Sequence, residues 1–433
     1  MACSEMIHVE DLEVIYEGSQ KPAVEGVNFD LRPGELKTLT GPNGGGKTTI
    51  LRAITGLIPS FYPGIVKGHI EIDGCNPHEC DPREKVFLLL QDPKIQVTGA
   101  TVLLEAASPL VLRGVDRRTI MKRVMEQLRV YGLLDYQWTH VYMLSSGLLQ
   151  RTALAAAGVL GSRYLLLDEP SSFLDRRAKS VLYSILDRLR KEGVGILVAT
   201  HDVRLAELAD ESYIVNRGLN RGIYRASMRQ QLHPPRNGSE LVLQLEKVST
   251  QYPGSNQIVI HDISLYAKKG EIVLLQGPNG GGKTTILYTI AGFLKTTKGK
   301  VIIKGKPRLL PADPFLVFPR GRLSDIIEDP GTISFTGKIN QIYDKPIYSL
   351  SGGELRLAAI AIVLASGGDI LLLDEPTAGL DPENKWLVVE SIHNLARVGY
   401  TIVVASHDED LAEIATRSYL VEEGRIRKCY GLC

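Results

Sequence analysis

Nine residues, GPNGGGKTT, run from Gly41 to Thr49 and recur letter for letter from Gly277 to Thr285. Both copies satisfy the pattern G-x-x-x-x-G-K-[ST], whose glycines let the backbone curl until several N–H groups point at one phosphate. The helix that follows adds its positive N-terminal end. A glycine-rich turn without a ligand is the alternative for a single match. Two copies, each between an apolar run (ELKTLT, EIVLLQ) and an apolar helix, favour two loops that bind nucleoside triphosphate.

These loops predict which side chains meet the nucleotide. Lys47 and Lys283 would reach the β- and γ-phosphates, and Thr48 and Thr284 would each give a hydroxyl to Mg²⁺. The loop residues that we expect to bind ATP are Asn43, Gly44, Gly45, Gly46, Lys47, Thr48 and Thr49 in the first copy, and Asn279, Gly280, Gly281, Gly282, Lys283, Thr284 and Thr285 in the second.

Length and composition indicate a globular protein of two domains. The chain has 433 residues, of which 44% are hydrophobic and 23% charged, and each half is long enough for its own core. The net charge of +1 gives no electrostatic reason to expect nucleic acid as a direct partner. No apolar run reaches the ~18 residues of a membrane span, and the N-terminus lacks a signal-peptide pattern. We expect domains at residues 1–228 and 241–433, joined by the polar linker RQQLHPPRNGSE at 229–240.

A tyrosine stands at the same distance before each loop. Tyr16 lies 31 positions before Lys47, and Tyr252 lies 31 positions before Lys283. Tyrosine on a strand is often plain packing. The matching offsets favour the alternative, in which each ring stacks on the base of a bound nucleotide.

Further motifs follow each loop in the same order. In the first half, VFLLL precedes Gln91, LSSGLLQR begins at Leu144, YLLLDEP carries Asp168 and Glu169, and GILVAT precedes His201. The second half has Ala312 where the first has Gln91. It continues with LSGGELR from Leu350, ILLLDEP with Asp374 and Glu375, and VVAS before His407.

The offsets between the copies show where the halves differ. The signature serines, the aspartates and the histidines are each 206 positions apart, whereas the loop lysines are 236 apart. The second half has therefore lost 30 residues between its phosphate loop and its LSGG motif, 15 on each side of Ala312. The nucleotide-binding core is duplicated, and the accessory region is shortened.

This ordered set of motifs resembles the ATP-binding cassette (ABC) ATPases over essentially the whole chain. The resemblance implies an α/β fold of two tandem P-loop domains, each with a RecA-like core, an antiparallel β subdomain and a helical subdomain that is shortened in the second. The segments GLIPSFYPGIVKGHIEIDG and QDPKIQVTGATV of the first half are similar, more narrowly, to ATPases of energy-coupling-factor importers.

The residues also suggest chemistry by themselves. Asp168 and Asp374, at the ends of apolar strands, would hold Mg²⁺, while the next residues, Glu169 and Glu375, would polarise the attacking water. Acidic residues can end any buried strand, but two such pairs within LLLDEP favour catalysis. A single histidine after a strand is usually structural. The resemblance makes His201 and His407 sensors of the γ-phosphate, and makes Gln91 a link between metal, water and the helical region.

In the resembled family two cassettes pair head to tail, so each ATP contacts one phosphate loop and the signature of the other half. The signature residues expected at the nucleotide are Ser145, Gly147, Ser351 and Gly353. This pairing puts both departures from the family pattern on one site. The second site would combine Ala312 with the signature LSSGL, in which Ser146 and Leu148 replace glycine and a polar residue. We expect it to be slower and to hold ATP longer, unless the replacements are neutral drift.

The resemblance implies an ATP-hydrolysing subunit of an importer. It would lie in the cytoplasm on the inner face of the cell membrane, bound to a transmembrane coupling protein and a substrate-binding membrane protein, and drive uptake of a vitamin or a metal ion. One alternative is a soluble twin-cassette ATPase acting on ribosomes or nucleic acid. Members known to us carry a long charged linker or a cysteine-rich front end, neither of which is found here. DNA-repair ATPases insert long modules between loop and signature, where this chain has 98 positions from Lys47 to Ser145.

Overall fold

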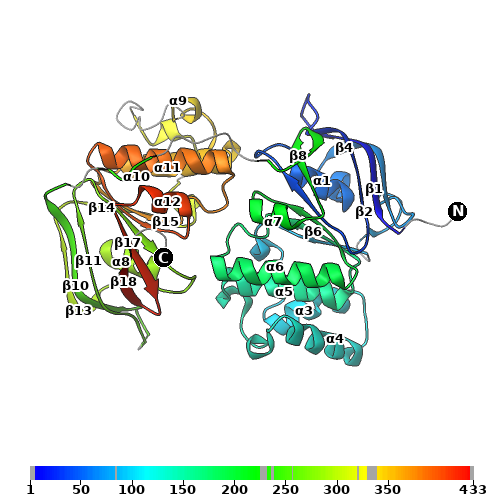
Figure 1. The fold of residues 1–433 in the computed structure, drawn as a ribbon, viewed down its shortest axis with the longest axis horizontal. Coiled ribbons are helices and arrows are strands. Elements are labelled where there is room, and N and C mark those ends of the chain that lie inside the picture. Colours follow the sequence, from blue (N-terminus) through cyan, green and yellow to red (C-terminus); the bar gives the residue numbers. More distant parts are fainter. Residues whose placement is uncertain are drawn as a thin grey trace. The chain divides into compact units, whose positions relative to one another are not determined.

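The computed structural model describes residues 5–82, 85–224, 232–235, 238–255, 257–318, 321–328 and 339–429. The chain forms two compact units, residues 1–225 and 226–433 (Figure 1). Of the expected linker at 229–240, residues 229–231 and 236–237 lie outside the described residues. Each unit is described below by itself.

The first unit contains two sheets. Its strands are β1 (Ile7–Tyr16), β2 (Val24–Leu31), β3 (Leu36–Thr40), β4 (Gly64–Ile72), β5 (Val86–Leu89), β6 (Tyr164–Asp168), β7 (Gly195–Ala199), β8 (Glu211–Asn216) and β9 (Gly218–Arg221). An antiparallel sheet has the order β2-β1-β4, and a larger sheet has the order β5-β6-β7-β3-β8-β9. The larger sheet is parallel from β5 to β8, and β9 pairs with β8 antiparallel.

The helices of the first unit are α1 (Lys47–Ile54), α2 (Leu57–Ser60), α3 (Val102–Val111), α4 (Arg117–Val130), α5 (Ser146–Leu160), α6 (Arg176–Lys191) and α7 (Val203–Leu208), with 3₁₀ turns η2 (Pro93–Ile95), η3 (Leu134–Tyr136) and η4 (Val141–Met143). Several begin at a polar cap predicted by sequence rules. The Asp116 carboxylate accepts hydrogen bonds from two backbone N–H groups at the start of α4. The Asp175 carboxylate accepts one from the N–H of Ala178 at the start of α6. In Figure 1, α3 to α6 lie on one side of the larger sheet and the antiparallel sheet lies on the other.

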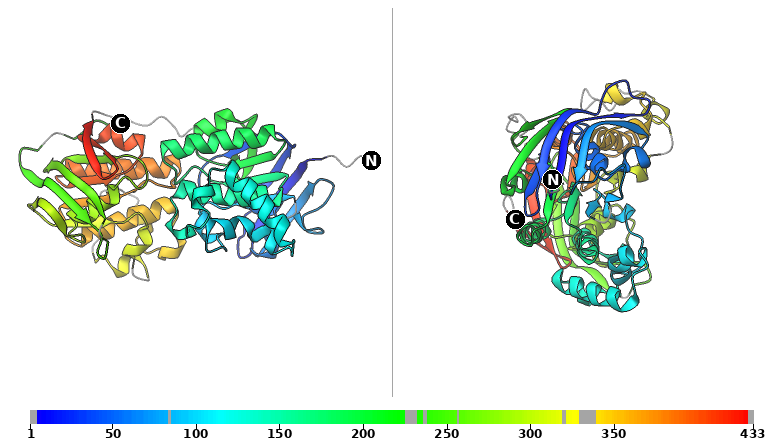
Figure 2. Two further views of the ribbon diagram at one scale, coloured as in Figure 1. Left: turned by 90° about the horizontal axis from the view of Figure 1, so that it is seen from below. Right: turned by 90° about the vertical axis from the view of Figure 1, so that its right-hand side faces the viewer.

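The second unit repeats this architecture. Its strands are β10 (Leu241–Gln251), β11 (Ile258–Lys268), β12 (Ile272–Gln276), β13 (Thr296–Ile303), β14 (Pro307–Leu310), β15 (Ile370–Asp374), β16 (Thr401–Ala405), β17 (Arg417–Glu422) and β18 (Arg425–Cys429). The sheet orders are β11-β10-β13 and β14-β15-β16-β12-β17-β18, which match the first unit strand for strand. Figure 2 shows the antiparallel strands of this unit, in green, gathered at one of its ends.

The helices of the second unit are α8 (Lys283–Ile290), α9 (Ile339–Ile342), α10 (Gly352–Ala365), α11 (Pro382–Arg397) and α12 (Glu409–Ile414), with 3₁₀ turns η5 (Pro314–Val317), η6 (Leu323–Asp325) and η8 (Ile347–Ser349). Between the edge strand β5 and helix α5, which begins at the signature motif, the first unit has the long helices α3 and α4. The described part of the same region in the second unit has only α9 and short 3₁₀ turns. The helical subdomain of the second unit is therefore shortened, as the offsets predict.

The parallel strands are buried on both faces, and each face belongs to a different core. In β6, Leu165 and Leu167 pack in the core beneath the helices, whereas Leu166 packs in the core beneath the antiparallel sheet. In β15, Leu371 and Leu372 divide between two cores in the same way. This double burial explains why the runs YLLLD and ILLLD are continuously apolar. Within the described residues, no helix is long and apolar enough to span a bilayer.

Candidate active site

Each phosphate loop joins a buried strand to a helix, β3 to α1 and β12 to α8. Gly46 has φ +107°, and a Cβ there would lie 2.1 Å from Cγ1 of Val24, so only glycine fits. The Nζ of Lys47 donates to the carbonyl oxygens of Gly41 at 2.8 Å and of Pro42 at 3.1 Å. The second loop has the same geometry at the same two distances through Lys283. The backbone thus forms a curled cradle with an ammonium group at its mouth.

A hydroxyl and a carboxylate face each other beside each loop. The Oγ1 of Thr48 donates to Asp168 Oδ2 at 2.9 Å, and that of Thr284 donates to Asp374 Oδ2 at 2.8 Å. Burial raises the pKa of Asp168, against the hydrogen bond from Thr48, and raises the pKa of Asp374 to about 6. Hydroxyl and carboxylate oxygens are hard donors of the kind that Mg²⁺ takes together with phosphates and water. These residues therefore fit a magnesium ion that arrives with a nucleotide.

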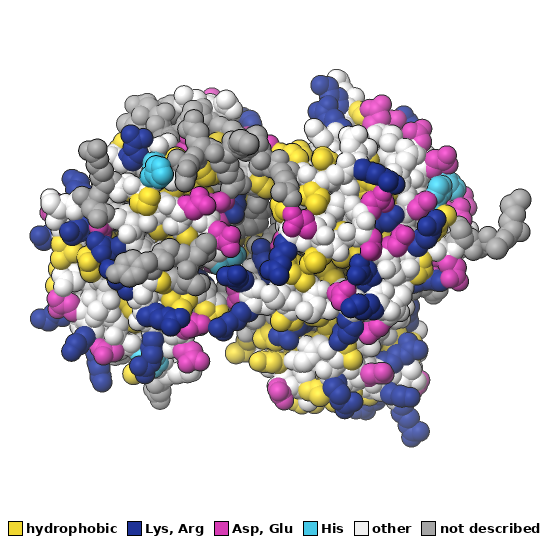
Figure 3. Space-filling view, in the orientation of Figure 1, with side chains coloured by type: hydrophobic (Ala, Val, Ile, Leu, Met, Phe, Trp, Pro, Cys, Tyr) yellow, Lys and Arg dark blue, Asp and Glu magenta, His cyan; other side chains and the backbone are white. Residues whose placement is uncertain are grey.

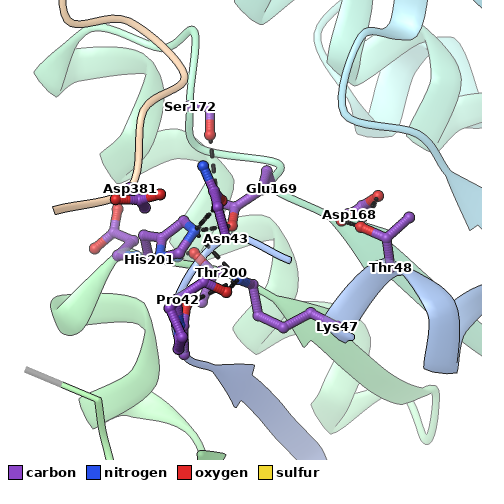
Figure 4. A network of polar contacts seen from close by, with 12 residues as sticks. Pro42, Asn43, Lys47, Thr48, Asp168, Glu169, Ser172, Thr200, His201 and Asp381 are labelled. Atoms are coloured by element: carbon purple, nitrogen blue, oxygen red, sulfur yellow. Dashed lines mark hydrogen bonds and ion pairs between the residues drawn. The ribbon is translucent and has the colours of Figure 1, made fainter. Parts of the chain in front are cut away.

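The glutamate after β6 lies at the centre of a polar network (Figure 4). His201 Nε2 lies 3.2 Å from Glu169 Oε1, 3.2 Å from Asn43 Oδ1 and 3.2 Å from Lys47 Nζ. Ser172 donates its hydroxyl to Glu169 Oε2 at 3.3 Å. Burial raises the pKa of Glu169 to about 7. Asn43, Lys47, Glu169 and His201, which the sequence predicts at the site, therefore lie together here. This is the arrangement expected of a catalytic base and its neighbours.

The glutamate after β15 has different neighbours. His407 approaches through Nδ1, 3.2 Å from Glu375 Oε2, and Ser406 donates to Oε2 at 3.2 Å. Burial acts to raise the pKa of Glu375, but the hydrogen bond and charge of His407, together with Lys283, hold it below the usual value. The two units therefore place the same residue types together in two arrangements.

The tyrosines before the loops reach them directly. Tyr16 Oη lies 3.2 Å from Thr49 Oγ1, and Tyr252 Oη lies 3.1 Å from Thr285 Oγ1. Tyr252 is 38% exposed. The geometry fits the expected stacking role, which stays a proposal.

The segment after β5 is held by a residue that the sequence did not single out. Gln96 donates to Leu88 O at 2.6 Å and accepts from Leu90 N at 3.1 Å. These bonds fix the loop that carries Gln91, whose own side chain is exposed. In the second unit Ala312 occupies the corresponding loop, and its carbonyl accepts from Arg356 Nη1 at 2.7 Å. The bond from Arg356 joins residues 44 positions apart, and the bonds of Gln96 depend on the shape of an irregular loop, so periodic sequence patterns carry no signal for either.

The signature residues begin α5 and α10. Ser145 and Ser351 are the N-caps, with hydroxyls that accept from the N–H groups of Leu148 and Glu354. A Cβ at Gly353 would lie 2.3 Å from Asn384, whereas one at Gly147 would lie 3.1 Å from Ala178. Glycine is thus required in the second signature and less strictly in the first.

The replacement of glycine by Ser146 costs the fold little. A Cβ at Gly352, the matching position, would meet only Leu380 Cδ2, at an ordinary contact distance of 3.6 Å. The second unit thus has room for a side-chain carbon at the position that Ser146 occupies in the first.

Each unit thus combines a curled loop, a hydroxyl–carboxylate pair and a glutamate directly after a buried strand, an arrangement that fits the active site of a P-loop ATPase. Residues 24–172 and 260–378 match the ABC transporter family. These matches cover more than half of the chain, so the protein belongs to the ABC transporter family and is an ATPase with two fused cassettes.

Relatives of similar length are known in archaea and bacteria. A putative ABC transporter ATP-binding protein of Saccharolobus solfataricus is 28% identical, over 97% of this chain and 93% of that protein. One of Streptomyces coelicolor is 28% identical with the same coverage of both chains.

Two solved structures match nearly the whole fold. One is an RNase-L inhibitor, with a TM-score of 0.68 and 22% identity over 98% of this chain and 90% of that one. The other is an archaeal ribosome recycling factor in complex with a ribosomal stalk protein, with a TM-score of 0.68 and 22% identity over 96% and 89%. At 22% identity, these matches show a similar fold and nothing about function.

Proposed function

We propose that this chain is a motor ATPase whose two cassettes pair head to tail on ATP–Mg²⁺ and separate after hydrolysis, which moves a partner protein. The observation that carries this proposal is the set of phosphate loop, Thr–Asp pair and glutamate beside a histidine in each of two units of one chain. Such a pair couples hydrolysis to conformational change, since each bound nucleotide stabilises the paired state by its differential affinity.

The groups of each unit have distinct tasks in this scheme. Lys47 and the loop N–H groups bind phosphate oxygens, and Thr48 and Asp168 would hold Mg²⁺, which neutralises charge on the phosphates. Glu169 orients and polarises the attacking water, with His201 beside it. Their counterparts are Lys283, Thr284, Asp374, Glu375 and His407. The Oγ of Ser351 and the N–H of Gly353 would complete the first site from the other cassette, and Ser145 and Gly147 would complete the second.

Exposed apolar side chains suggest where a partner binds. In the helical region of the first unit, Leu112 is 83%, Trp138 72% and Met143 80% exposed. In the shortened region of the second, Leu316 is 73% and Tyr348 89% exposed. Yellow side chains are visible over α3 to α5 of the first unit in Figure 3. Apolar side chains that gather on one surface commonly mark a protein interface.

The first candidate partner is a transmembrane transport protein. The relatives named above are ABC transporter ATP-binding proteins matched along nearly their whole length. The two segments similar to energy-coupling-factor ATPases support an importer, in which the partners would be a coupling protein and a substrate-binding protein in the cytoplasmic membrane. Its solute would be a vitamin or a metal ion.

The second candidate partner is the ribosome. The archaeal ribosome recycling factor named above shares the fold over 96% of this chain, which supports this candidate. The likeness supports the arrangement of two fused cassettes, and the choice of partner rests on experiment.

The decisive experiment is capture of the partner in the closed state. A tagged chain carrying Glu169→Gln and Glu375→Gln, expressed in its cell of origin, should trap ATP and retain its partner. The matched control carries Lys47→Ala and Lys283→Ala, which removes phosphate binding. A membrane-protein complex enriched over the control supports the importer, and sedimentation with ribosomal subunits supports the second candidate. No ATP-dependent association with either would contradict both.

A further inference from the structure

The segment that carries His407 is anchored by a lysine on α11. Lys385 Nζ lies 2.8 Å from Asp408 Oδ1 and 3.0 Å from Asp410 Oδ2. Asp408 is the residue directly after His407. The side chains of Lys385, Asp408 and Asp410 are 27%, 8% and 17% exposed, so solvent screens this cluster less than it screens a surface ion pair. Lys385 therefore holds two carboxylates at the start of α12.

The anchored segment contacts the glutamate of the second site at two points. The N–H of Asp408 donates to Ser406 Oγ at 3.2 Å, and Asp408 Oδ1 accepts from the N–H of Asp410 at 3.0 Å, which caps α12. Ser406 donates its hydroxyl to Glu375 Oε2 at 3.2 Å, and His407 Nδ1 lies 3.2 Å from the same oxygen. Because residues 406–408 are consecutive, the position of Asp408 limits where His407 can point.

The first unit repeats the lysine and the aspartate but not the close pair. The matching residues, 206 positions earlier, are Lys179 and Asp202. Lys179 Nζ lies 3.5 Å from Asp202 Oδ2, farther than in the second unit. The residue that matches Asp410 is Arg204, so a positive charge stands where the second unit has its second carboxylate. The lysine of the first unit is therefore the weaker anchor.

A tyrosine provides the closer contact in the first unit. Tyr183, on α6, donates its hydroxyl to Asp202 Oδ2 at 2.6 Å. The second unit has Val389 at this position, and a valine side chain has no donor. The aspartate after the histidine is thus held chiefly by a hydroxyl in the first unit and by an ammonium group in the second.

We propose that Lys385 is a positioning residue of the second ATP site: by holding Asp408 and Asp410, it fixes the direction from which His407 meets Glu375 and the γ-phosphate. The lysine acts through the backbone of residues 406–408 and not on the nucleotide, so its loss slows hydrolysis and leaves ATP binding intact. A displacement of about 1 Å at a catalytic group can cost on the order of 10²-fold in rate. This inference rests on the proposed function, which places His407 beside Glu375 in catalysis.

The test measures hydrolysis and ATP affinity at the second site separately. In a full-length chain carrying Glu169→Gln, Lys385→Met should slow single-turnover hydrolysis by about tenfold or more and leave ATP affinity unchanged. Lys385→Arg keeps a cation that can donate to both carboxylates and should restore most of the rate. The matched control is Lys179→Met in a chain carrying Glu375→Gln. It should lose about threefold or less at the first site, because Asp202 keeps its bond from Tyr183.

A double-mutant cycle separates positioning from general damage. In a chain that also carries His407→Ala, Lys385→Met should cause no further loss of rate, because the residue through which it acts is gone. Equal losses with and without His407, weaker ATP binding, or an unchanged rate overturn the proposal. If Lys385→Met fails to fold, Asp408→Asn decides, since asparagine keeps an acceptor for the α12 cap, and a full rate in that variant overturns the proposal. If the Glu169→Gln parent hydrolyses no ATP, the proposed activity of the second site fails instead.

Discussion

Glu169 and Glu375 adopt a backbone conformation that residues with side chains rarely take. Their φ angles are +46° and +45°, which costs on the order of 1–3 kcal/mol. The neighbouring strand stabilises this conformation, because the N–H of Glu169 donates to the carbonyl of Ala199 and that of Glu375 to the carbonyl of Ala405, each at 2.8 Å. The strain is equal in the two units, so it cannot make the sites unequal. The difference that we predict between the sites would come from side chains, such as Ser172, which bonds Glu169 where the second unit has Ala378.

The two glycines of the second signature should differ in tolerance. Gly353→Ala should lower the free energy of unfolding by about 1–3 kcal/mol, because the new Cβ overlaps Asn384. Gly352→Ala is the matched control and should be neutral or slightly stabilising, since its Cβ has room and alanine favours helices. Urea unfolding of the nucleotide-free chain measures both. Equal effects would show that the contact with Asn384 does not constrain this position.

At the scale of elements, a cross-strand pair joins β1 to β2. His8 Nδ1 lies 2.6 Å from Asp30 Oδ1, and the hydrogen bond and charge of Asp30, with Glu10 and Glu71, raise the pKa of His8 against the effect of burial. A raised folded-state pKa means that the pair stabilises the fold at pH values below the unfolded pKa of about 6.5. The contribution is lost as the pH rises through the folded value.

Asp30→Asn should therefore destabilise the chain more in acid than in base. We expect a loss of about 0.2–1 kcal/mol at pH 5.5, modest because the pair is partly exposed, and a smaller loss at pH 8. Unfolding free energies of parent and variant at both pH values measure this. His8→Asn is the control: in that background, the loss of unfolding free energy caused by Asp30→Asn should no longer depend on pH. A larger loss at pH 8 would contradict the assigned pair.

The helical subdomains also predict unequal docking. The first unit has α3 and α4, whereas the described part of the second has α9 and 3₁₀ turns. We expect the first to provide the larger binding surface. Photo-crosslinkers placed at Leu112 and Trp138 should capture the partner in higher yield than those at Leu316 and Tyr348. Equal yields from both units would count against this prediction.

At the scale of the whole molecule, the fold could be predicted from the sequence, whereas some contacts of the site are seen only in the structure. The fused-cassette fold could be predicted from the sequence, because the glycines of the loop and the apolar runs YLLLD and ILLLD each impose local geometry. The convergence of Asn43, Lys47 and Glu169 on His201 follows from that fold. The contacts of Gln96 could not be predicted, because they depend on the shape of an irregular loop. The bond from Arg356 to the Ala312 carbonyl could not be predicted either, because it joins residues 44 positions apart.

The central claim is that one chain contains two unequal ATP sites, the first more active than the second. Steady-state ATP hydrolysis by Glu169→Gln and Glu375→Gln, measured side by side with ATP binding, tests it most directly. Both variants should still bind ATP, because the phosphate loops are intact. Glu169→Gln should lose most of the turnover, with hydrolysis at that site slowed by ~10²-fold or more, and Glu375→Gln should lose much less. Equal losses would contradict the claim and show that the two sites work alike.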